Sequence, residues 1–344
     1  MKISVIDLFC GGGGATQGFI DGGANVVLGI DNWDKAIKLH ELNHPDIPIL
    51  NYELGGDYQE LIDLFLEFVD LEGHIHLHGS PPCQDLSNAS GGNEKEGMKL
   101  VNWFIGLCNR FREVCLILGY SFSWSMENVV PAKKYLDENK INNIVINSAN
   151  QGVAQTRKRV FAGEAWIYEK SYHKNEWKSI VDVLPHLDEE VKIMKSMRGK
   201  GKYNDFTTRT QMKTITGISP FMFKFRDRFT INTAGFVNSP NGGDEFGNMR
   251  YSRFIDQPVK TIHNNQPILR FMKDENDYSR LRTLTIEEIS ILMGYPNFKY
   301  DLDIVNKKDT HQIIGNMVCP PVAKAIIEGI HRKKNMKTLF SNWN

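Results

Sequence analysis

The sequence predicts an α/β fold in which a mostly parallel β-sheet is joined to a second, smaller and loop-rich domain. Over the first 165 residues, short apolar runs alternate with segments of helical periodicity, the order of strand–helix–strand units. Near residue 170 the alternation stops, and basic and aromatic residues are interleaved with glycine and threonine. We therefore expect a large domain over 1–171, a second domain over 172–280, and a C-terminal segment over 281–344 that returns to the large domain.

The strands and helices of the large domain are predicted in a regular order. The run KISVIDLF at 2–9 predicts a buried strand, and the glycines behind it open a short helix. Apolar spacing over 58–71 predicts a longer helix, and HIHLHG at 74–79 predicts the strand that follows it. Further strands are predicted at 25–31, 121–129 and 142–150, and further helices at 285–296 and 320–333.

The composition is that of an ordinary soluble globular protein. Of 344 residues, 41% are hydrophobic and 24% are charged, with a net charge of zero. We find no apolar run of the roughly 18–20 residues that a membrane span needs, and no signal peptide. Five cysteines, an odd number without metal-type spacing, indicate reduced thiols. We expect a monomeric cytoplasmic protein, or one inside the nucleoid or the host cell if the chain is viral.

Glycines 11–14 separate the first strand from the first helix. Such a turn lets the backbone approach a ligand closely, and it presents helix N-terminal amides to a carboxylate or phosphate. About 20 residues further along the chain, Asp31 ends the second strand, where a carboxylate can hold ribose hydroxyls. The pair predicts a nucleotide-type ligand, and a purely structural tight turn is the alternative.

A cysteine stands in a stiff loop, GSPPCQDLS at 79–87. Pro81 and Pro82 fix φ and lack backbone donors, so they restrict the direction in which Cys83 can point. The thiol is either buried and inert or a nucleophile whose direction matters. The loop alone leaves both interpretations open.

Two further patterns carry weaker signals. His74, His76 and His78 alternate, so they share one face of a strand as metal ligands sometimes do, but no carboxylate or cysteine completes a site and we expect no metal. Between 192 and 228, ten lysines and arginines face only two acids, with aromatic residues interleaved. This stretch suits a nucleic-acid backbone, and a solvated surface loop is the alternative.

Six short blocks follow one another along the chain. They are Phe9, Gly11 and Gly13 in F-x-G-x-G; Pro82-Cys83-Gln84; Glu127-Asn128-Val129; Gln155-x-Arg157-x-Arg159; Arg282, Leu284, Thr285 and Glu288 in R-x-L-T-x-x-E; and Gly315-Asn316 before Val318. In this order the blocks resemble the cytosine-C5 DNA methyltransferases. The resemblance covers residues 1–165 and 280–330.

The resemblance implies a Rossmann-like, S-adenosylmethionine-dependent methyltransferase fold. It makes 1–171 the catalytic and cofactor-binding domain and 172–280 the target-recognition domain. Cys83 would add to C6 of cytosine, Glu127 would hydrogen-bond N3, and Arg159 would hold the base, with Gln155 and Arg157 shaping the catalytic site. The expected partner is duplex DNA, from which the target base is flipped. A cognate restriction endonuclease is a second candidate partner.

By the same resemblance the methyl donor is S-adenosyl-L-methionine. The chain departs from the family at Asn32, where a bulky apolar residue often follows the ribose-binding acid; either Trp33 covers the adenine instead, or the contact is weaker. Substrate contacts are expected from Ser87, Asn128 and Thr261. The residues expected to hold the cofactor are Phe9, Gly11, Gly13, Asp31, Asn32, Trp33, Asp57, Tyr58, Pro82 and Asn316.

Three other functions fit part of the sequence. A transfer-RNA cytosine-C5 methyltransferase would keep every catalytic block, and the basic variable region favours DNA over it only moderately. A catalytically silent nucleic-acid-binding protein would not need Cys83, Glu127 and Arg159 together. A nicotinamide-dependent oxidoreductase would fit the glycine turn but leave the Pro-Cys-Gln and Gln-x-Arg-x-Arg blocks unexplained. Methyl transfer from S-adenosylmethionine to C5 of cytosine in DNA is therefore the function that we expect.

Overall fold

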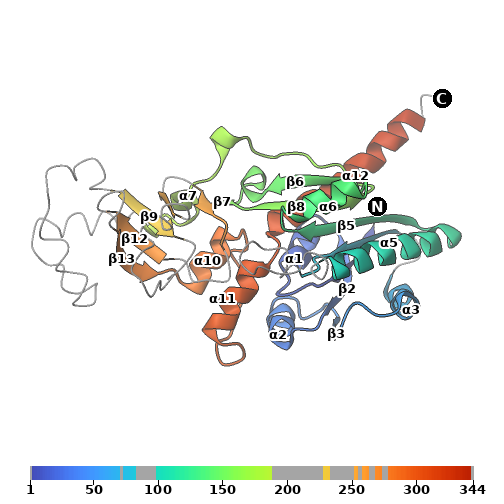
Figure 1. Cartoon of the computed structure of the whole chain (residues 1–344), viewed down its shortest axis with the longest axis horizontal. Coiled ribbons are helices and arrows are strands. Elements are labelled where there is room, and N and C mark those ends of the chain that lie inside the picture. Colours follow the sequence, from blue (N-terminus) through green and yellow to red (C-terminus); the bar gives the residue numbers. More distant parts are fainter. Residues whose placement is uncertain are drawn as a thin grey trace, which may run out of the picture.

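The computed structural model shows a seven-stranded sheet with helices on both faces (Figure 1). Cys83, Ser87 and all but the last residue of the basic stretch 192–228 lie outside the described residues. The described residues are 2–69, 73–82, 98–187, 228–232, 252–254, 258–262, 268–272 and 278–341.

Parallel pairing dominates this sheet. Its strand order is β3-β2-β1-β4-β5-β8-β6, and β8 is the strand that runs antiparallel to both of its neighbours. The mostly parallel α/β sheet predicted from the sequence is confirmed. The strands are β1 (Ile3–Leu8), β2 (Asn25–Asp31), β3 (Ile49–Asn51), β4 (His74–Gly79), β5 (Ser121–Asn128), β6 (Asn143–Asn147) and β8 (Lys158–Glu164).

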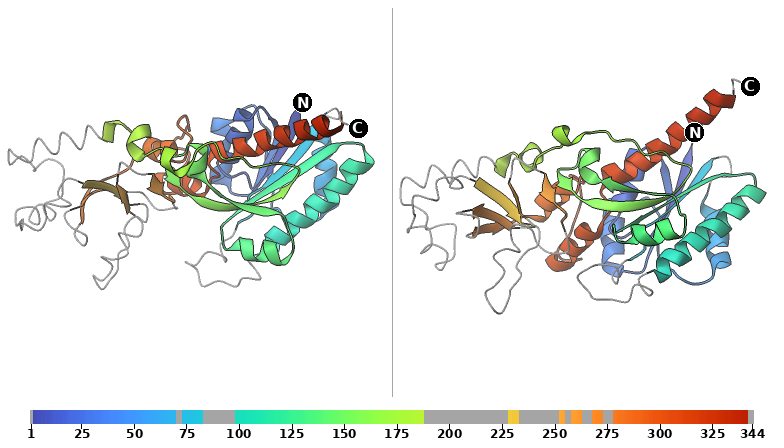
Figure 2. Two further views of the ribbon diagram at one scale, coloured as in Figure 1. Left: turned by 90° about the horizontal axis from the view of Figure 1, so that it is seen from above. Right: turned by 45° about the horizontal axis from the view of Figure 1, so that its top comes forward.

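Two apolar cores cover the two faces of the sheet. Because side chains alternate along a strand, Ile3 and Val5 of β1 pack with one set of helices, while Ile6 and Leu8 pack with the other. Figure 2 shows α12 and α5 on opposite sides of the sheet. The first core receives α1 (Gly14–Asp21), α2 (Asp34–Asn43), α10 (Ile286–Leu292), α11 (Lys307–Asn316) and α12 (Pro320–Ser341); the second receives α3 (Tyr58–Phe68), α5 (Lys99–Ile117) and α6 (Ala132–Glu138).

Helix α12 packs directly on α1, so the end of the described chain lies against its beginning. A Cβ atom on Gly18 of α1 would overlap the carbonyl oxygen of Pro320, and one on Gly14 would overlap that of Val318. Two glycines of the first helix therefore allow the contact between backbones. The domain boundaries at 171/172 and 280/281 stay predictions.

An apolar window within Lys307–Met336 is long enough to cross a membrane, with a mean hydropathy of 1.3, although the sequence reasoning above found no such run. Of this window, 78% is buried inside the protein. Packing of α11 and α12 in the first core accounts for the apolar character.

A second, antiparallel sheet has the order β10-β9-β12-β13. A separate short strand, β11 (Val259–Lys260), pairs in parallel with β7 (Gln155–Thr156), which immediately precedes β8. This pairing attaches the segment around residue 260 to the large domain. The remaining described elements are β9 (Arg228–Asn232), β10 (Ser252–Phe254), β12 (Ile268–Met272), β13 (Tyr278–Thr283), α7 (Ile180–Val183) and the 3-10 turns η1 (Ser148–Gln151) and η2 (Lys174–Glu176).

The three alternating histidines lie side by side on the α1 face of β4, opposite three serines of β5. Burial lowers the pKa of His74 to about 4 and that of His78 to about 3, and it holds the pKa of His76 well below its usual range. No cluster that could hold a metal ion occurs among the described residues. We call this array the histidine–serine ladder; it consists of His74, His76, His78, Ser80, Ser121, Ser123 and Ser125.

The ladder makes the protein sensitive to mild acid. Above pH 6.5 its rings are neutral in the folded and the unfolded chain. As the pH falls from 6.5 toward 4, the unfolded chain binds protons that the folded chain excludes, and each ring lowers the free energy of unfolding by about 1.4 kcal/mol per pH unit. Buried Asp7, whose pKa burial raises to about 7, acts in the opposite direction and offsets one ring. Urea unfolding at pH 7, 6 and 5 should show stability falling with pH.

Asp7→Asn is the matched control for this measurement, because it removes an opposing group beside the ladder. The fall in stability should be steeper in this variant than in the wild type. A free energy of unfolding that stays constant from pH 6.5 to 5 in both proteins would contradict the prediction.

Candidate active site

Most of the expected site residues that the structure describes gather at one edge of the sheet. The parallel strands β1, β2, β4 and β5 all end at this edge, which is where ligands bind in open α/β sheets. The glycine turn follows β1, Asp31 ends β2, Pro81 and Pro82 follow β4, and Glu127 and Asn128 end β5. Residues spread over more than 100 positions of the sequence therefore meet at one edge.

The glycine turn is held in a conformation that needs left-handed backbone. Gly11 and Gly13 have φ of 53° and 85°, and Phe9 adopts φ of 55° without being a glycine. The Asp31 carboxylate accepts the amide of Gly11 at 2.8 Å and that of Trp33 at 2.9 Å. Asp31 thus ties the end of β2 to the turn, and its position is fixed by two backbone amides.

His40 of α2 and His44, which follows the end of this helix, support the same turn from behind. His40 Nδ1 lies 3.2 Å from the carbonyl oxygen of Gly11, and His44 Nε2 lies 3.3 Å from that of Gly13. Tyr295 Oη lies 3.2 Å from His44 Nε2. Burial lowers the pKa of both rings, that of His40 to about 3, so they are neutral at pH 7. The sequence reasoning missed both residues; their i, i+4 spacing on a helix is the signal that places them on one face.

An aromatic group lies beside the turn. The ring of Trp103 in α5 meets Phe9 edge-on at 6.3 Å and Tyr58 at 5.9 Å, and its Nε1 donates to the carbonyl oxygen of Gly56 at 2.7 Å. Phe9 and Tyr58 are two of the residues expected at the adenine. Trp103 was not predicted, because nothing in the local sequence of α5 distinguishes it from a core residue.

The other expected adenine contacts have different surroundings. Asp57 caps α3 by accepting the amide of Gln59 at 2.7 Å, which accounts for a carboxylate at this place. Trp33 is half-buried against the first core, and Asn32 beside it is exposed. Their contacts with a cofactor stay predictions.

The turn has the space that a cofactor needs. A Cβ atom on Gly11 would meet nothing within 4 Å, whereas one on Gly12 would overlap Ile313 and one on Gly13 would overlap His44. One side of the turn is therefore open, and its other sides are closed by α2 and α11. Asn316, the last residue of α11, is exposed beside this turn. Open backbone, a fixed carboxylate and adjacent aromatic rings fit a nucleoside cofactor that carries an amino-acid end.

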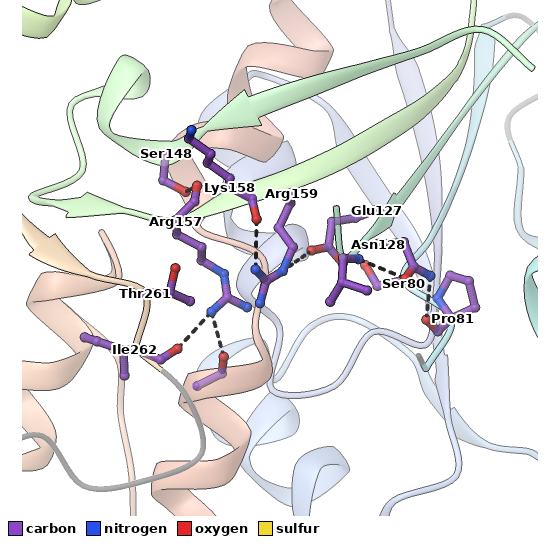
Figure 3. A network of polar contacts seen from close by, with 12 residues as sticks. Ser80, Pro81, Glu127, Asn128, Ser148, Arg157, Lys158, Arg159, Thr261 and Ile262 are labelled. Carbon is purple, nitrogen blue, oxygen red and sulfur yellow. Dashed lines mark hydrogen bonds and ion pairs between the residues drawn. The ribbon is translucent and has the colours of Figure 1, made fainter. Parts of the chain in front are cut away.

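An ion pair between buried Glu127 and half-buried Arg159 stands at the ends of β5 and β8. Arg159 Nε lies 3.0 Å from Glu127 Oε1, with side-chain exposures of 19% and 10% (Figure 3). Burial raises the pKa of Glu127, while the charges of Arg159 and Arg157 and the hydrogen bond from Arg159 oppose the shift. The sequence analysis gave Glu127 and Arg159 separate roles, and the structure brings the two side chains into direct contact.

Arg157 and Gln155 bind backbone groups instead of facing this pair. Arg157 donates to the carbonyl oxygens of Ile262 and Gly315 at 3.0 and 2.9 Å (Figure 3). Gln155 donates to the Leu292 carbonyl and accepts the amide of Ile262, each at 3.0 Å. The shaping role expected for both residues stays a prediction.

The loop that leads to Cys83 is anchored by Asn128. Its Nδ2 donates to the carbonyl oxygen of Pro81 at 3.2 Å, and its Oδ1 accepts the amide of Val129 (Figure 3). Asn128 is buried, and Pro82 is exposed at the last described position before Cys83. Asn128 thus positions the loop, and its substrate contact stays a prediction. Thr261, the expected recognition residue, donates to the Thr156 carbonyl at 3.4 Å.

Known structures share this arrangement of the chain. The S. pombe Dnmt2 methyltransferase matches with a TM-score of 0.58 at 14% identity, covering 96% of this chain and 99% of that one. The Entamoeba histolytica methyltransferase EhMeth matches with a TM-score of 0.56 at 17% identity, covering 96% and 98%. The fold is that of the S-adenosylmethionine-dependent methyltransferases.

Sequence relatives narrow the class. Type II methyltransferase M.HgiDI of Herpetosiphon aurantiacus is 26% identical over 330 residues, 92% of this chain and 90% of the relative. M.MthTI of Methanothermobacter thermautotrophicus is 25% identical over 372 residues, 99% and 100% of the two chains. The profile of the C-5 cytosine-specific DNA methylases matches residues 3–109 and 133–332, and the chain belongs to this family. The predicted family is confirmed, and with it an enzyme that uses S-adenosylmethionine as methyl donor.

Residues 110–132 lie outside the matched segments, and they include Glu127 and Asn128. The assignment of Glu127 therefore depends on its place at the end of β5 and on its contact with Arg159.

Asp31→Asn should weaken the binding of S-adenosylmethionine by about 10- to 100-fold, the effect of losing a hydrogen bond to a charged group. Asparagine has one acceptor oxygen where the carboxylate has two, so it cannot accept both amides and a ribose hydroxyl. Calorimetric titration of the cofactor without DNA measures the change.

Asp57→Asn is the control, because asparagine also caps helices. Equal weakening in both variants would mean that Asp57 contacts the cofactor too. Unchanged affinity in Asp31→Asn would contradict the assignment of Asp31.

Proposed function

We propose that the chain methylates C5 of a cytosine that is flipped out of duplex DNA, through a covalent bond between Cys83 and C6. The observation that carries the proposal is the ion pair of buried Glu127 and half-buried Arg159, which stands beside the anchored loop that leads to Cys83. Cytosine C5 is a poor nucleophile, and addition of a thiolate to C6 makes it enamine-like. The site must therefore supply a thiolate, a proton donor and a cation.

Glu127 suits the role of proton donor at N3 of the base. Burial favours the protonated carboxyl, and only a protonated carboxyl can donate to a ring nitrogen. A hydrogen bond to N3 withdraws electrons from the ring and eases attack at C6. Arg159 keeps the carboxyl oriented and stops it from becoming permanently neutral.

Arg159 also suits the role of the cation. Its guanidinium is partly buried at the mouth of the site, so its charge acts at lower dielectric than in water. A neighbouring cation favours the thiolate form of a cysteine, which is the nucleophilic form. The rigid Pro81-Pro82 approach, held by Asn128, would direct Cys83 toward the base.

The cofactor supplies an electrophilic methyl group when it is bound. On this chain the glycine turn and Asp31 would hold it, with Phe9 and Tyr58 beside its adenine and Asn316 closing the site from α11. Since the glycine turn and Glu127 lie at the same edge of the sheet, one site would receive both the cofactor and the base.

The partners follow from the chemistry. A cytosine inside a duplex is accessible to such a site only after base flipping. The basic stretch 192–228 would follow the phosphates, and Thr261 would lie near base edges. The named relatives are type II methyltransferases, which supports a cognate restriction endonuclease as partner. We propose that the chain acts as a monomer in the cytoplasm.

Cys83→Ala should abolish methyl transfer and leave the affinity for S-adenosylmethionine unchanged, because the thiol bonds to the base and not to the donor. Wild-type protein should form a denaturant-resistant complex with duplex DNA that carries 5-fluorocytosine, since fluorine cannot leave C5 as a proton does. Gel electrophoresis detects the complex. Methylation by Cys83→Ala would contradict the covalent step, and preferential labelling of transfer RNA in a mixed assay would contradict duplex DNA as substrate.

Glu127→Gln should lower the rate of methyl transfer by about 100-fold or more, the usual contribution of a positioned acid, and change cofactor affinity less than twofold. Single-turnover assays and calorimetry measure the two quantities.

Glu164→Gln is the matched control for this variant. Glu164 lies at the other end of β8 and pairs with Arg112 at 2.9 Å on the surface, so its loss should leave the rate unchanged. Equal rates in the two variants would exclude Glu127 from the reaction.

A further inference from the structure

The histidine–serine ladder forms one unbroken chain of hydrogen-bonding groups along β4 and β5. Each of Ser123 and Ser125 lies between two imidazole rings, because the parallel register places His74, His76 and His78 opposite Ser121, Ser123 and Ser125. At the outer end, His74 Nδ1 lies 2.8 Å from Ser121 Oγ, and His74 Nε2 lies 2.6 Å from Ser123 Oγ. In the middle, His76 Nδ1 lies 2.7 Å from Ser123 Oγ, and His76 Nε2 lies 2.9 Å from Ser125 Oγ. At the inner end, His78 Nδ1 lies 2.8 Å from Ser125 Oγ, and His78 Nε2 lies 3.2 Å from Ser80 Oγ.

Apolar packing isolates the middle of the ladder from water. His76, His78 and Ser125 are completely buried, and the ring of Phe19 lies 5.0 Å from that of His78 and 5.9 Å from that of His76. Strands buried on both faces of a parallel sheet usually carry Val, Ile or Leu. Burial of polar residues here is tolerated because each has a hydrogen-bond partner.

Every member of the ladder is able to donate one proton and accept one. The rings are neutral at pH 7 because burial lowers their pKa values, and a neutral imidazole has one N–H donor and one bare nitrogen. A serine hydroxyl likewise donates once and accepts. In two uniform proton arrangements, every ring protonated on Nδ1 or every ring protonated on Nε2, Ser123 and Ser125 each donate one hydrogen bond within the ladder and accept one.

The ladder connects the protein surface with the candidate active site. Ser121 is exposed at the start of β5. At the other end, Glu127 follows Ser125 by two positions, so it continues the same face of β5, and Ser80 follows His78 on the neighbouring strand. Figure 3 shows Ser80 and Glu127 at the adjoining ends of the two strands.

The methylation reaction releases a proton at this buried place. When a methyl group replaces hydrogen on C5, the electron pair of the C–H bond returns to the ring and the hydrogen leaves as H⁺. One proton per turnover must therefore reach solvent. Glu127 is largely buried, so it cannot pass such a proton directly to bulk water.

We propose that the histidine–serine ladder conducts the released proton from the active site to solvent at Ser121. The proposal depends on the proposed function, because only C5 substitution supplies the proton.

One proton enters the ladder at Ser80 for each proton that leaves it at Ser121. A water molecule in the site passes a proton to Ser80 Oγ, which passes its own to His78 Nε2. Each ring then gives its Nδ1 proton to the next serine, and each serine gives its hydroxyl proton to the Nε2 of the next ring, until Ser121 releases one proton to solvent. All rings end protonated on Nε2. Before the next turnover, local opening of the strands admits water, and each ring loses its Nε2 proton to water and gains one on Nδ1 from water, an exchange that moves no net proton.

The charged groups around the ladder favour this neutral, stepwise transfer. His331 and Lys334 of α12 lower the pKa of His74, so a stable imidazolium at the outer end is disfavoured. On β1, Asp7 stands opposite His78 in the register, and burial raises the pKa of its carboxyl to about 7. The rings therefore pass protons without holding an extra one.

Ser123→Val and Ser123→Thr form an isosteric pair that tests the proposal. The side chains have the same shape, and only threonine keeps the hydroxyl between His74 and His76. Ser4→Ala is the control for loss of a buried hydroxyl: Ser4 lies on β1, is fully buried, and its Oγ has no hydrogen-bond partner among the described residues.

The experiment compares methyl transfer with proton release in one turnover. The protein with bound S-adenosylmethionine is mixed with duplex DNA in weak buffer; quenched samples report methyl transfer, and a pH-indicator dye reports protons in solution. In the wild type, Ser123→Thr and Ser4→Ala, proton release should occur at the same rate as methyl transfer. In Ser123→Val, proton release should lag behind methyl transfer by about tenfold or more, the lower part of the range for a positioned proton-transfer group.

Coincident methyl transfer and proton release in Ser123→Val would overturn the proposal. Absence of methyl transfer in the wild type would instead refute the proposed function. If the valine variant does not fold, Ser125→Val and Ser125→Thr give the same comparison at the hydroxyl between His76 and His78. Delayed proton release in Ser125→Val, but not in Ser125→Thr, supports the ladder; coincident methyl transfer and proton release in both variants overturns it.

Discussion

The fold depends on a backbone contact that only glycine permits. Gly14 and Gly18 of α1 lie against the carbonyl oxygens of Val318 and Pro320, at distances where any side chain would overlap. The contact brings the C-terminal helices onto the first helix. It also closes the glycine turn from one side with Ile313 of α11 and with Met317, which follows that helix. The candidate cofactor site is therefore assembled from the two ends of the described chain, and neither end forms it alone.

The site also depends on polar groups that are buried with partners. Asp31, Glu127, Arg157 and Asn128 each form hydrogen bonds or ion pairs that connect separate segments of the chain. An unpaired charge at such depth costs several kcal/mol, so these contacts restrict the site to one arrangement. Polar groups in the sheet interior are likewise buried with partners, because serine hydroxyls form hydrogen bonds with the histidines of β4.

Much of this organisation was predictable from the sequence, because it is encoded in short-range patterns. The parallel sheet follows from alternating apolar runs, and the place of Asp31 follows from its distance to the glycines. The partners of buried groups were not predictable, because each depends on contacts between distant segments: Trp103 meets Phe9 across the edge of the sheet, and His44 meets Tyr295. The serines at 121, 123 and 125 repeat the period of the histidines at 74, 76 and 78, a signal that could have revealed the ladder.

Arg157 recognises its two partners through their carbonyl oxygens, those of Ile262 and Gly315, and not through their side chains. Gln155 likewise binds the backbone amide of Ile262. Every residue type offers a carbonyl oxygen, and every type except proline offers an amide, so these hydrogen bonds place almost no demand on the side chain of residue 262. Residue 262 can therefore change its type in evolution and keep the hydrogen bonds that attach it to β7 and to Arg157.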